Sequence, residues 1–64
     1  MKVRDVIKRI ETDGWYLKRT RGDHRIYHHP DKPGIVVVAG HPAGDVPAGT
    51  LGQIFKQAGV DKNG

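Results

Sequence analysis

Apolar residues recur at helical spacing near both ends of the chain. The first stripe has intervals of three and four positions, which is typical of an amphipathic helix, and comprises Val3, Val6, Ile7 and Ile10. Gly14 can adopt the positive φ that ends a helix, so we expect this helix over about residues 2–13. A second stripe, before Gly59, predicts another helix and comprises Leu51, Ile54, Phe55 and Ala58.

Signals for the start of the second helix precede this stripe. Asp45 is a candidate cap, because an Asp side chain accepts hydrogen bonds from the free N–H groups of a first helical turn. Pro47 suits an early helical position, where its missing N–H would have no partner. We expect the chain after Gly59, and residues 61–64 in particular, to form a frayed tail.

Three strands are predicted between the helices. Residues 15–20 are rich in aromatic and long side chains, and residues 24–29 follow after a glycine-containing turn at residues 21–23. So short a connection makes these two strands antiparallel. Residues 35–39 form the clearest strand, because they are an apolar, β-branched run between two glycines.

The predicted fold class is α+β, in the order helix, three antiparallel strands, helix. Two apolar helix stripes must be buried, and one face of the sheet can accept both helices. The third strand is apolar on both faces, so the pattern permits either face to be covered. We favour Tyr27, Val36 and Val38 toward the helices, which leaves His24 and His28 on the open face because side chains alternate along a strand.

Composition narrows the class of protein. Sixty-four residues suffice for a single domain, residues 1–64, with a thin core and little room for a deep pocket. The 11 basic and 7 acidic residues give a net charge of +4, which favours nucleic acid or an acidic protein as partner, although solubility alone is a simpler explanation. The absence of cysteine fits a reducing cytoplasm. The sequence has neither a membrane-spanning run nor a signal peptide, so we expect no membrane association.

The candidate chemistry lies where His24 follows the glycine turn. Cleavage of RNA requires removal of the 2′-hydroxyl proton and protonation of the leaving 5′-oxygen, and an imidazole exchanges protons near neutral pH. We take His24 as the candidate catalytic residue, although a strand histidine is more often a surface or packing residue. His28 is a candidate RNA-binding group, and a second proton-transfer group if it shares this face. The candidate phosphate-binding residues are Lys18, Arg19, Arg21 and Arg25.

The aromatic residues and Asp23 near His24 are less specific indicators of RNA chemistry than His24 itself. Trp15, Tyr16 or Tyr27 could stack an RNA base wherever the ring is exposed. Asp23 could orient His24, but a turn residue that bonds its own backbone is the simpler interpretation.

The remaining histidines are assigned structural or solvated roles. His29 precedes Pro30 and shapes the turn, and His41 lies in a loop. A zinc site is disfavoured, because the adjacent His28 and His29 point to opposite faces of a regular strand. We expect no metal and no other cofactor.

Together these motifs resemble the HicA family, the small mRNA-interferase toxins of bacterial and archaeal HicA–HicB toxin–antitoxin pairs. The resemblance runs nearly end to end. The matching features are the leading helix, Gly14-Trp15, Gly22, His24, Tyr27, His29-Pro30, Lys32-Pro33-Gly34, Val36, Val38, Pro47, Gly49-Thr50-Leu51, Ile54 and Gln57-Ala58-Gly59.

The resemblance implies a fold like a double-stranded-RNA-binding domain and a metal-independent ribonuclease that acts on mRNA. It places the catalytic histidine at His24 and implies a HicB antitoxin that binds the chain and blocks this residue. The residues that it marks as structural motif are Gly22, Tyr27, Pro47, Gly49 and Thr50.

Two departures from the family pattern lower the local positive charge. Asp23 stands where the family often has a small serine, and an acid there would repel phosphate slightly. Ala43 and Gly44 stand in a loop where family members often carry lysines.

The function hypotheses are therefore ranked. The first is a toxin ribonuclease of the cytoplasm that uses His24. The alternative is a non-catalytic RNA-binding module with the same fold, for which loss of His24 would matter little and charge reversal at Arg21 and Arg25 would matter most. A pure protein-interaction domain with an acidic partner is the third.

Overall fold

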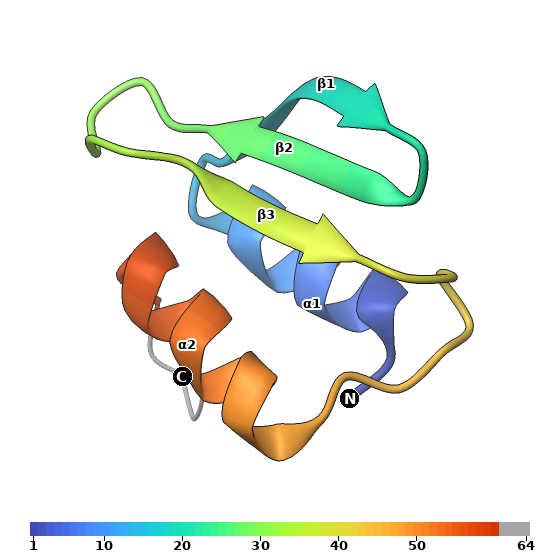
Figure 1. Ribbon diagram of the computed structural model, residues 1–64. Helices are drawn as coiled ribbons and strands as arrows, with labels where there is room; N and C mark the ends of the chain where they lie inside the picture. The colour runs from blue at the N-terminus through green and yellow to red at the C-terminus, as the bar shows by residue number, and fades with distance from the viewer. Residues whose placement is uncertain (61–64) are drawn as a thin grey trace.

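The computed structural model describes residues 1–60, which form two layers, a three-stranded sheet and two helices against one of its faces (Figure 1). The sheet has the order β1-β2-β3 with antiparallel neighbours. The α+β class and the order of elements predicted from the sequence are confirmed. The expected tail at 61–64 lies outside the described residues. The elements are α1 (Val3–Thr12), β1 (Tyr16–Arg21), β2 (His24–His28), β3 (Val36–Ala39) and α2 (Ala48–Ala58).

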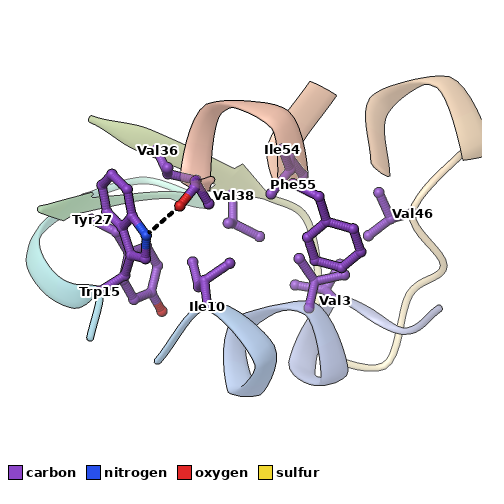
Figure 2. Packing of buried hydrophobic residues seen from close by; sticks show 11 residues of the cluster. Val3, Ile10, Trp15, Tyr27, Val36, Val38, Val46, Ile54 and Phe55 are labelled. Carbon is purple, nitrogen blue, oxygen red and sulfur yellow. Dashed lines mark hydrogen bonds between the residues drawn. The ribbon is translucent and has the colours of Figure 1, made fainter. Parts of the chain in front are cut away.

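The covered face of the sheet is the one expected. Tyr27, Val36 and Val38 are buried against the helices (Figure 2). Alternation along β2 and β3 therefore leaves the side chains of His24 and His28 on the open face. The connections add Trp15 and Val46 to the core, and the helices contribute Val3, Val6, Ile10, Ile54, Phe55 and Ala58.

The start of α2 differs from the sequence prediction. Asp45 does not cap the helix; it forms an isolated bridge with Lys2, and its carboxylate lies 3.5 Å from the Lys2 ammonium. Pro47 itself is the N-cap residue, with φ −58°, and it makes no side-chain hydrogen bond to the first turn of α2. Backbone hydrogen bonds from the Val3 N–H to the Gly44 carbonyl and from the Val46 N–H to the Met1 carbonyl join this loop to the N-terminal residues.

The end of α2 is better ordered than expected. Gly59 adopts the left-handed conformation, with φ 65°, and its N–H donates to the Lys56 carbonyl. The Val60 N–H donates to the Phe55 carbonyl at 3.0 Å, and the Val60 side chain packs against the core. Fraying does not therefore begin at Val60, because a glycine in this conformation closes the last helical turn.

Trp15 joins the α1–β1 connection to the end of α2. Its side chain is only 2% exposed, and the indole Nε1–H donates to the Ala58 carbonyl at 3.0 Å (Figure 2). Trp15 therefore belongs to the core, and β1 begins at Tyr16 instead of at Trp15. This hydrogen bond satisfies one of the carbonyls that an α-helix leaves without a partner at its C-terminus.

Lys32 makes a polar clamp on the same side of the molecule. Its ammonium donates to the Asp13 carboxylate, to the Ala58 carbonyl at 3.0 Å and to the Gly59 carbonyl at 3.1 Å. A lysine ammonium has three N–H donors, so this geometry uses all of them. The clamp ties the end of α1, the β2–β3 connection and the end of α2 together.

The glycines of α2 yield a first prediction. A Cβ added at Gly49 or Gly52 would meet no atom within 4 Å, whereas one at Gly59 would lie 3.1 Å from the Lys32 Nζ. We expect Gly49→Ala and Gly52→Ala each to raise the free energy of unfolding by about 0.5–1 kcal/mol, because glycine is a poor helix former. Gly59→Ala should lower it by about 1–2 kcal/mol, because a Cβ disfavours the left-handed conformation. Urea unfolding measures all three, and a loss of stability in either helical variant would contradict the prediction.

The clamp yields a second prediction, on acid stability. The hydrogen bond from Lys32 lowers the pKa of Asp13 below its ordinary value of 3.8; desolvation opposes this lowering in part, and the positive charge of Lys32 adds to it. A lowered pKa in the folded state means that the carboxylate stabilises the fold above the pKa of the unfolded chain. This stabilisation is lost as the pH falls through the folded-state pKa.

We therefore expect the free energy of unfolding to fall as the solution is acidified below about pH 4, and to fall less steeply in Asp13→Asn. Urea titrations at a series of pH values measure the slope. Asp5→Asn removes the same charge from the exposed first turn of α1 and serves as the control. Equal slopes in the parent and in Asp13→Asn would show that the clamp carries no acid dependence.

Candidate functional site

The open face of the sheet carries three cross-strand rows of side chains, because residues directly opposite each other in neighbouring strands share a face. The first row adjoins the β1–β2 turn, the second crosses the middle of the sheet, and the third lies at the far end. In that order, the rows are Arg21, His24 and Ala39; Arg19, Ile26 and Val37; and Tyr16 and His28.

A β-bulge at Lys18 decides which β1 side chains reach this face. The register passes from Leu17 opposite Tyr27 directly to Arg19 opposite Ile26, so Lys18 is the extra residue. Strict alternation from Tyr16 would bring Lys18 to the open face and send Arg19 to the covered side. The bulge reverses this order after Leu17, and it brings Arg19 and Arg21 to the same face as His24.

The β1–β2 turn holds His24 at the edge of this surface. Gly22 has φ 61°, and Asp23, like the other non-glycine residues of the described chain, has no positive φ. This is the pattern of a type II′ turn, whose first central position favours glycine. The Asp23 carbonyl accepts a hydrogen bond from the Gly40 N–H at 3.3 Å, which fixes the turn against the end of β3.

His24 is exposed and lines a shallow hollow of about 420 Å³. The other residues that line it are Arg21, Ile26 and Val37. The imidazole therefore lies beside a guanidinium on an otherwise apolar floor. Such a surface can accept an anionic group next to a group that exchanges protons.

Arg25 is separated from this group. Its register partners are Thr20 and Val38, which places it on the helix side of the sheet. Its Nη1 donates to the Gly40 carbonyl at 2.8 Å. Arg25 is one of the residues predicted to bind phosphate. Its guanidinium lies on the face opposite His24, as alternation along β2 requires, and contacts Gly40 there.

His28 shares the open face with His24, as expected, and stands beside Tyr16. The two ring centroids are 6.4 Å apart with planes inclined by 33°. Tyr16 is 46% exposed, whereas Trp15 and Tyr27 are each 2% exposed. The sequence predicts base stacking for whichever of Trp15, Tyr16 and Tyr27 has an exposed ring. Tyr16 meets this condition, and Trp15 and Tyr27 do not because both belong to the core.

His29 has a structural role. Its Nε2 lies 2.8 Å from the Asp13 carbonyl, and its Nδ1 accepts hydrogen bonds from the N–H groups of Asp31 and Lys32 at 2.9 and 3.1 Å. A carbonyl only accepts, so these partners require the neutral tautomer with hydrogen on Nε2. The ring also meets Trp15 edge-on, 5.2 Å between centroids. His29 shapes the turn after β2, and it belongs to the clamp instead of the open face.

The family model described as the HicA toxin of bacterial toxin–antitoxin systems matches residues 3–60. The chain belongs to the HicA toxin family. Membership gives it the toxin role in a toxin–antitoxin system and implies an antitoxin as its partner. A search of curated proteins found no match to the chain.

The motif residues of this HicA-family chain occupy different parts of the fold. Gly22 forms the turn before His24, and Tyr27 is a core residue of β2. Pro47 caps α2, and Gly49 and Thr50 are exposed in its first turn. Pro47 and Thr50 also line a second hollow of about 230 Å³ between β3 and the start of α2.

Among residues 1–60, no group of three or more His, Cys, Asp or Glu side chains is placed to hold a metal ion. None of the helices in that range has the length and apolar character needed to cross a membrane.

The roles of the adjacent histidines lead to a third prediction. The His29 side chain is 6% exposed and has hydrogen-bond partners at both ring nitrogens. We expect His29→Ala to lower the free energy of unfolding by about 1–3 kcal/mol, because it leaves these polar groups without partners. Urea unfolding of His29→Ala, His28→Ala and His24→Ala makes the comparison. An unchanged midpoint in His29→Ala, or an equal loss in all three variants, would contradict the structural role of His29.

Proposed function

We propose that the chain is a metal-independent endoribonuclease that cleaves mRNA, with His24 as the general acid or base. The observation that carries the proposal is the pairing of His24 with Arg21 in an exposed hollow of the open face. The family resemblance at Gly22 and His24 agrees with it. This activity would account for the toxin role, because loss of mRNA stops translation.

The proposed reaction is an internal transesterification. The imidazole of His24 takes the proton of the 2′-hydroxyl, and the 2′-oxygen attacks the neighbouring phosphorus. The bond from phosphorus to the 5′-oxygen breaks, and this oxygen takes up a proton. The products are a 2′,3′-cyclic phosphate and a 5′-hydroxyl end. A positioned imidazole typically contributes a factor of about 10²–10⁴ to such a proton transfer.

Arg21 and Arg19 supply the positive charge on the same face. A guanidinium can donate two parallel hydrogen bonds to phosphate oxygens, and it would stabilise the charge that develops on them during attack. Arg21 stands directly across from His24, and Arg19 lies one row further along. Lys18, exposed at the bulge, adds charge at the edge of this surface.

His28 is assigned RNA binding without proton transfer. Its backbone position is four residues from His24 along β2, a separation of roughly 13 Å at the ordinary rise of a strand. The Ile26 side chain lies between the two histidines on the same face. A phosphate bound at His24 is therefore proposed not to reach His28.

The proposed protein partner is a HicB-type antitoxin that covers the open face. Val37 is 39% exposed on this face of β3, and Ile35, directly before β3, is 49% exposed; such apolar area beside basic residues suits a protein interface. Binding there would exclude RNA from His24. Since mRNA is the proposed substrate, the proposed location is the cytoplasm.

The decisive test is cleavage of end-labelled RNA by purified protein in excess EDTA. The parent is expected to give a 2′,3′-cyclic phosphate and a 5′-hydroxyl, and His24→Ala is expected to lose at least about 100-fold in rate. His41→Ala is the matched control, because His41 is an exposed histidine whose Nδ1 accepts the Ala43 N–H in a loop outside the three rows. A His24→Ala variant as active as the parent would overturn the assignment of His24.

Binding measured alongside cleavage separates the two functions. Arg21→Gln should weaken RNA binding and lower the slope of log affinity against log salt by about one, as loss of one phosphate contact does. Arg4→Gln removes an exposed arginine from α1 and should change neither. RNA binding without cleavage by either the parent or His24→Ala would favour the non-catalytic RNA-binding module.

A further inference from the structure

The open face ends in an aromatic pair that the proposed chemistry does not use. Tyr16 and His28 are directly opposite in the β1–β2 register, and their rings are inclined by only 33°. Tyr16 is nearly half exposed although it is one of the largest apolar side chains of the sheet. A tyrosine in this position contributes little to the core, so its exposed ring is available to a ligand.

The neighbouring charges indicate what kind of ligand this is. Arg19 occupies the next row and Arg21 the row after it, both on the side of the sheet that carries Tyr16. An exposed aromatic pair followed by guanidinium groups matches the alternation of bases and phosphates in a nucleic acid strand. An acidic peptide would use the arginines but would gain much less from the rings.

We infer that Tyr16 and His28 form a base-stacking site for one unpaired nucleotide of the RNA, at the opposite end of the open face from His24. The inference rests on the proposed function, since it takes RNA to be the ligand. The strand would run along β2, with one phosphate near His24 and Arg21, another near Arg19 and a base on the Tyr16 ring. The span between the two ends is roughly 13 Å, the rise of four strand residues.

This arrangement selects single-stranded RNA. A base inside an A-form duplex is stacked on both sides and presents no free face to a protein ring. A base in a loop or an unpaired segment can turn out and lie on Tyr16. The site is also tolerant of sequence, because every base has a π-face, so it fixes the position of the strand and leaves the choice of base to other contacts.

The test uses RNA binding by the His24→Ala protein, which keeps the open face and lacks the proposed catalytic group. The probe is a short, fluorescently labelled single-stranded RNA of mixed sequence, compared with a duplex of the same sequence. Tyr16→Thr removes the ring and keeps a residue that favours strands, and Tyr16→Phe keeps the ring. Leu17→Thr is the matched control, because Leu17 is 49% exposed at the next position and lies on the other side of β1.

We expect Tyr16→Thr to weaken single-strand binding about tenfold or more, with Tyr16→Phe restoring it and Leu17→Thr leaving it unchanged. The slope of log affinity against log salt should stay the same in Tyr16→Thr, because no phosphate contact is lost. Duplex binding should not depend on Tyr16. His28→Ala should give a smaller loss in the same direction.

An abasic scan locates the stacked base. Removing one base at a time from the RNA should weaken binding to the Tyr16-containing protein at one position, and the same removal should have no further effect on Tyr16→Thr. Circular dichroism of each variant checks that the sheet is intact.

The outcomes separate the two proposals. Cleavage by the parent in EDTA together with equal RNA affinity of the Tyr16→Thr protein would overturn the stacking site and leave the ribonuclease in place. A loss of affinity that appears equally with duplex RNA, or in Leu17→Thr, would also overturn it. Absence of RNA binding and of cleavage would overturn both.

Discussion

The Lys32 ammonium links the C-terminal ends of both helices at one end of the thin core. Lys32 donates to the Asp13 carboxylate at the end of α1 and to the last two carbonyls of α2. Carbonyls at a helix C-terminus lack partners within the helix and carry partial negative charge, so a cation is favoured there. Two residues of the connections make hydrogen bonds at the same helix ends: Trp15, between α1 and β1, bonds the Ala58 carbonyl, and His29, between β2 and β3, bonds the Asp13 carbonyl. Both helices are thereby held against the face of the sheet opposite His24.

Much of the fold could be predicted from the sequence, because helical and strand periodicities act over short distances. The stripe from Val3 to Ile10, the run at residues 35–39 and the turn at Gly22 each specify an element locally. The Lys32 contacts could not be predicted in this way, since its partners lie 19 to 27 positions away in the chain. Asp45 failed as a cap for the same reason, because its long-range pairing with Lys2 replaced the local role.

The candidate site was predictable in part. His24 could be located because a glycine turn and basic neighbours mark it, and its face followed from alternation along β2. The face on which Arg19 and Arg21 lie could not, because the bulge at Lys18 adds one residue to β1 and leaves no mark in the hydrophobic pattern. This single insertion brings Arg19 and Arg21 to the same face as His24, while Arg25, adjacent to His24 in the sequence, contacts Gly40 on the other side.

All six residues of β1 are exposed, and the buried contacts belong to the helices, β2, β3 and the connections. β1, which presents Tyr16, Arg19 and Arg21, therefore contributes no buried side chain to the core. Most substitutions of exposed side chains change stability little, so this strand can vary while the fold persists. Substitutions along this one outer strand can therefore alter the open face while the two-layer scaffold stays the same.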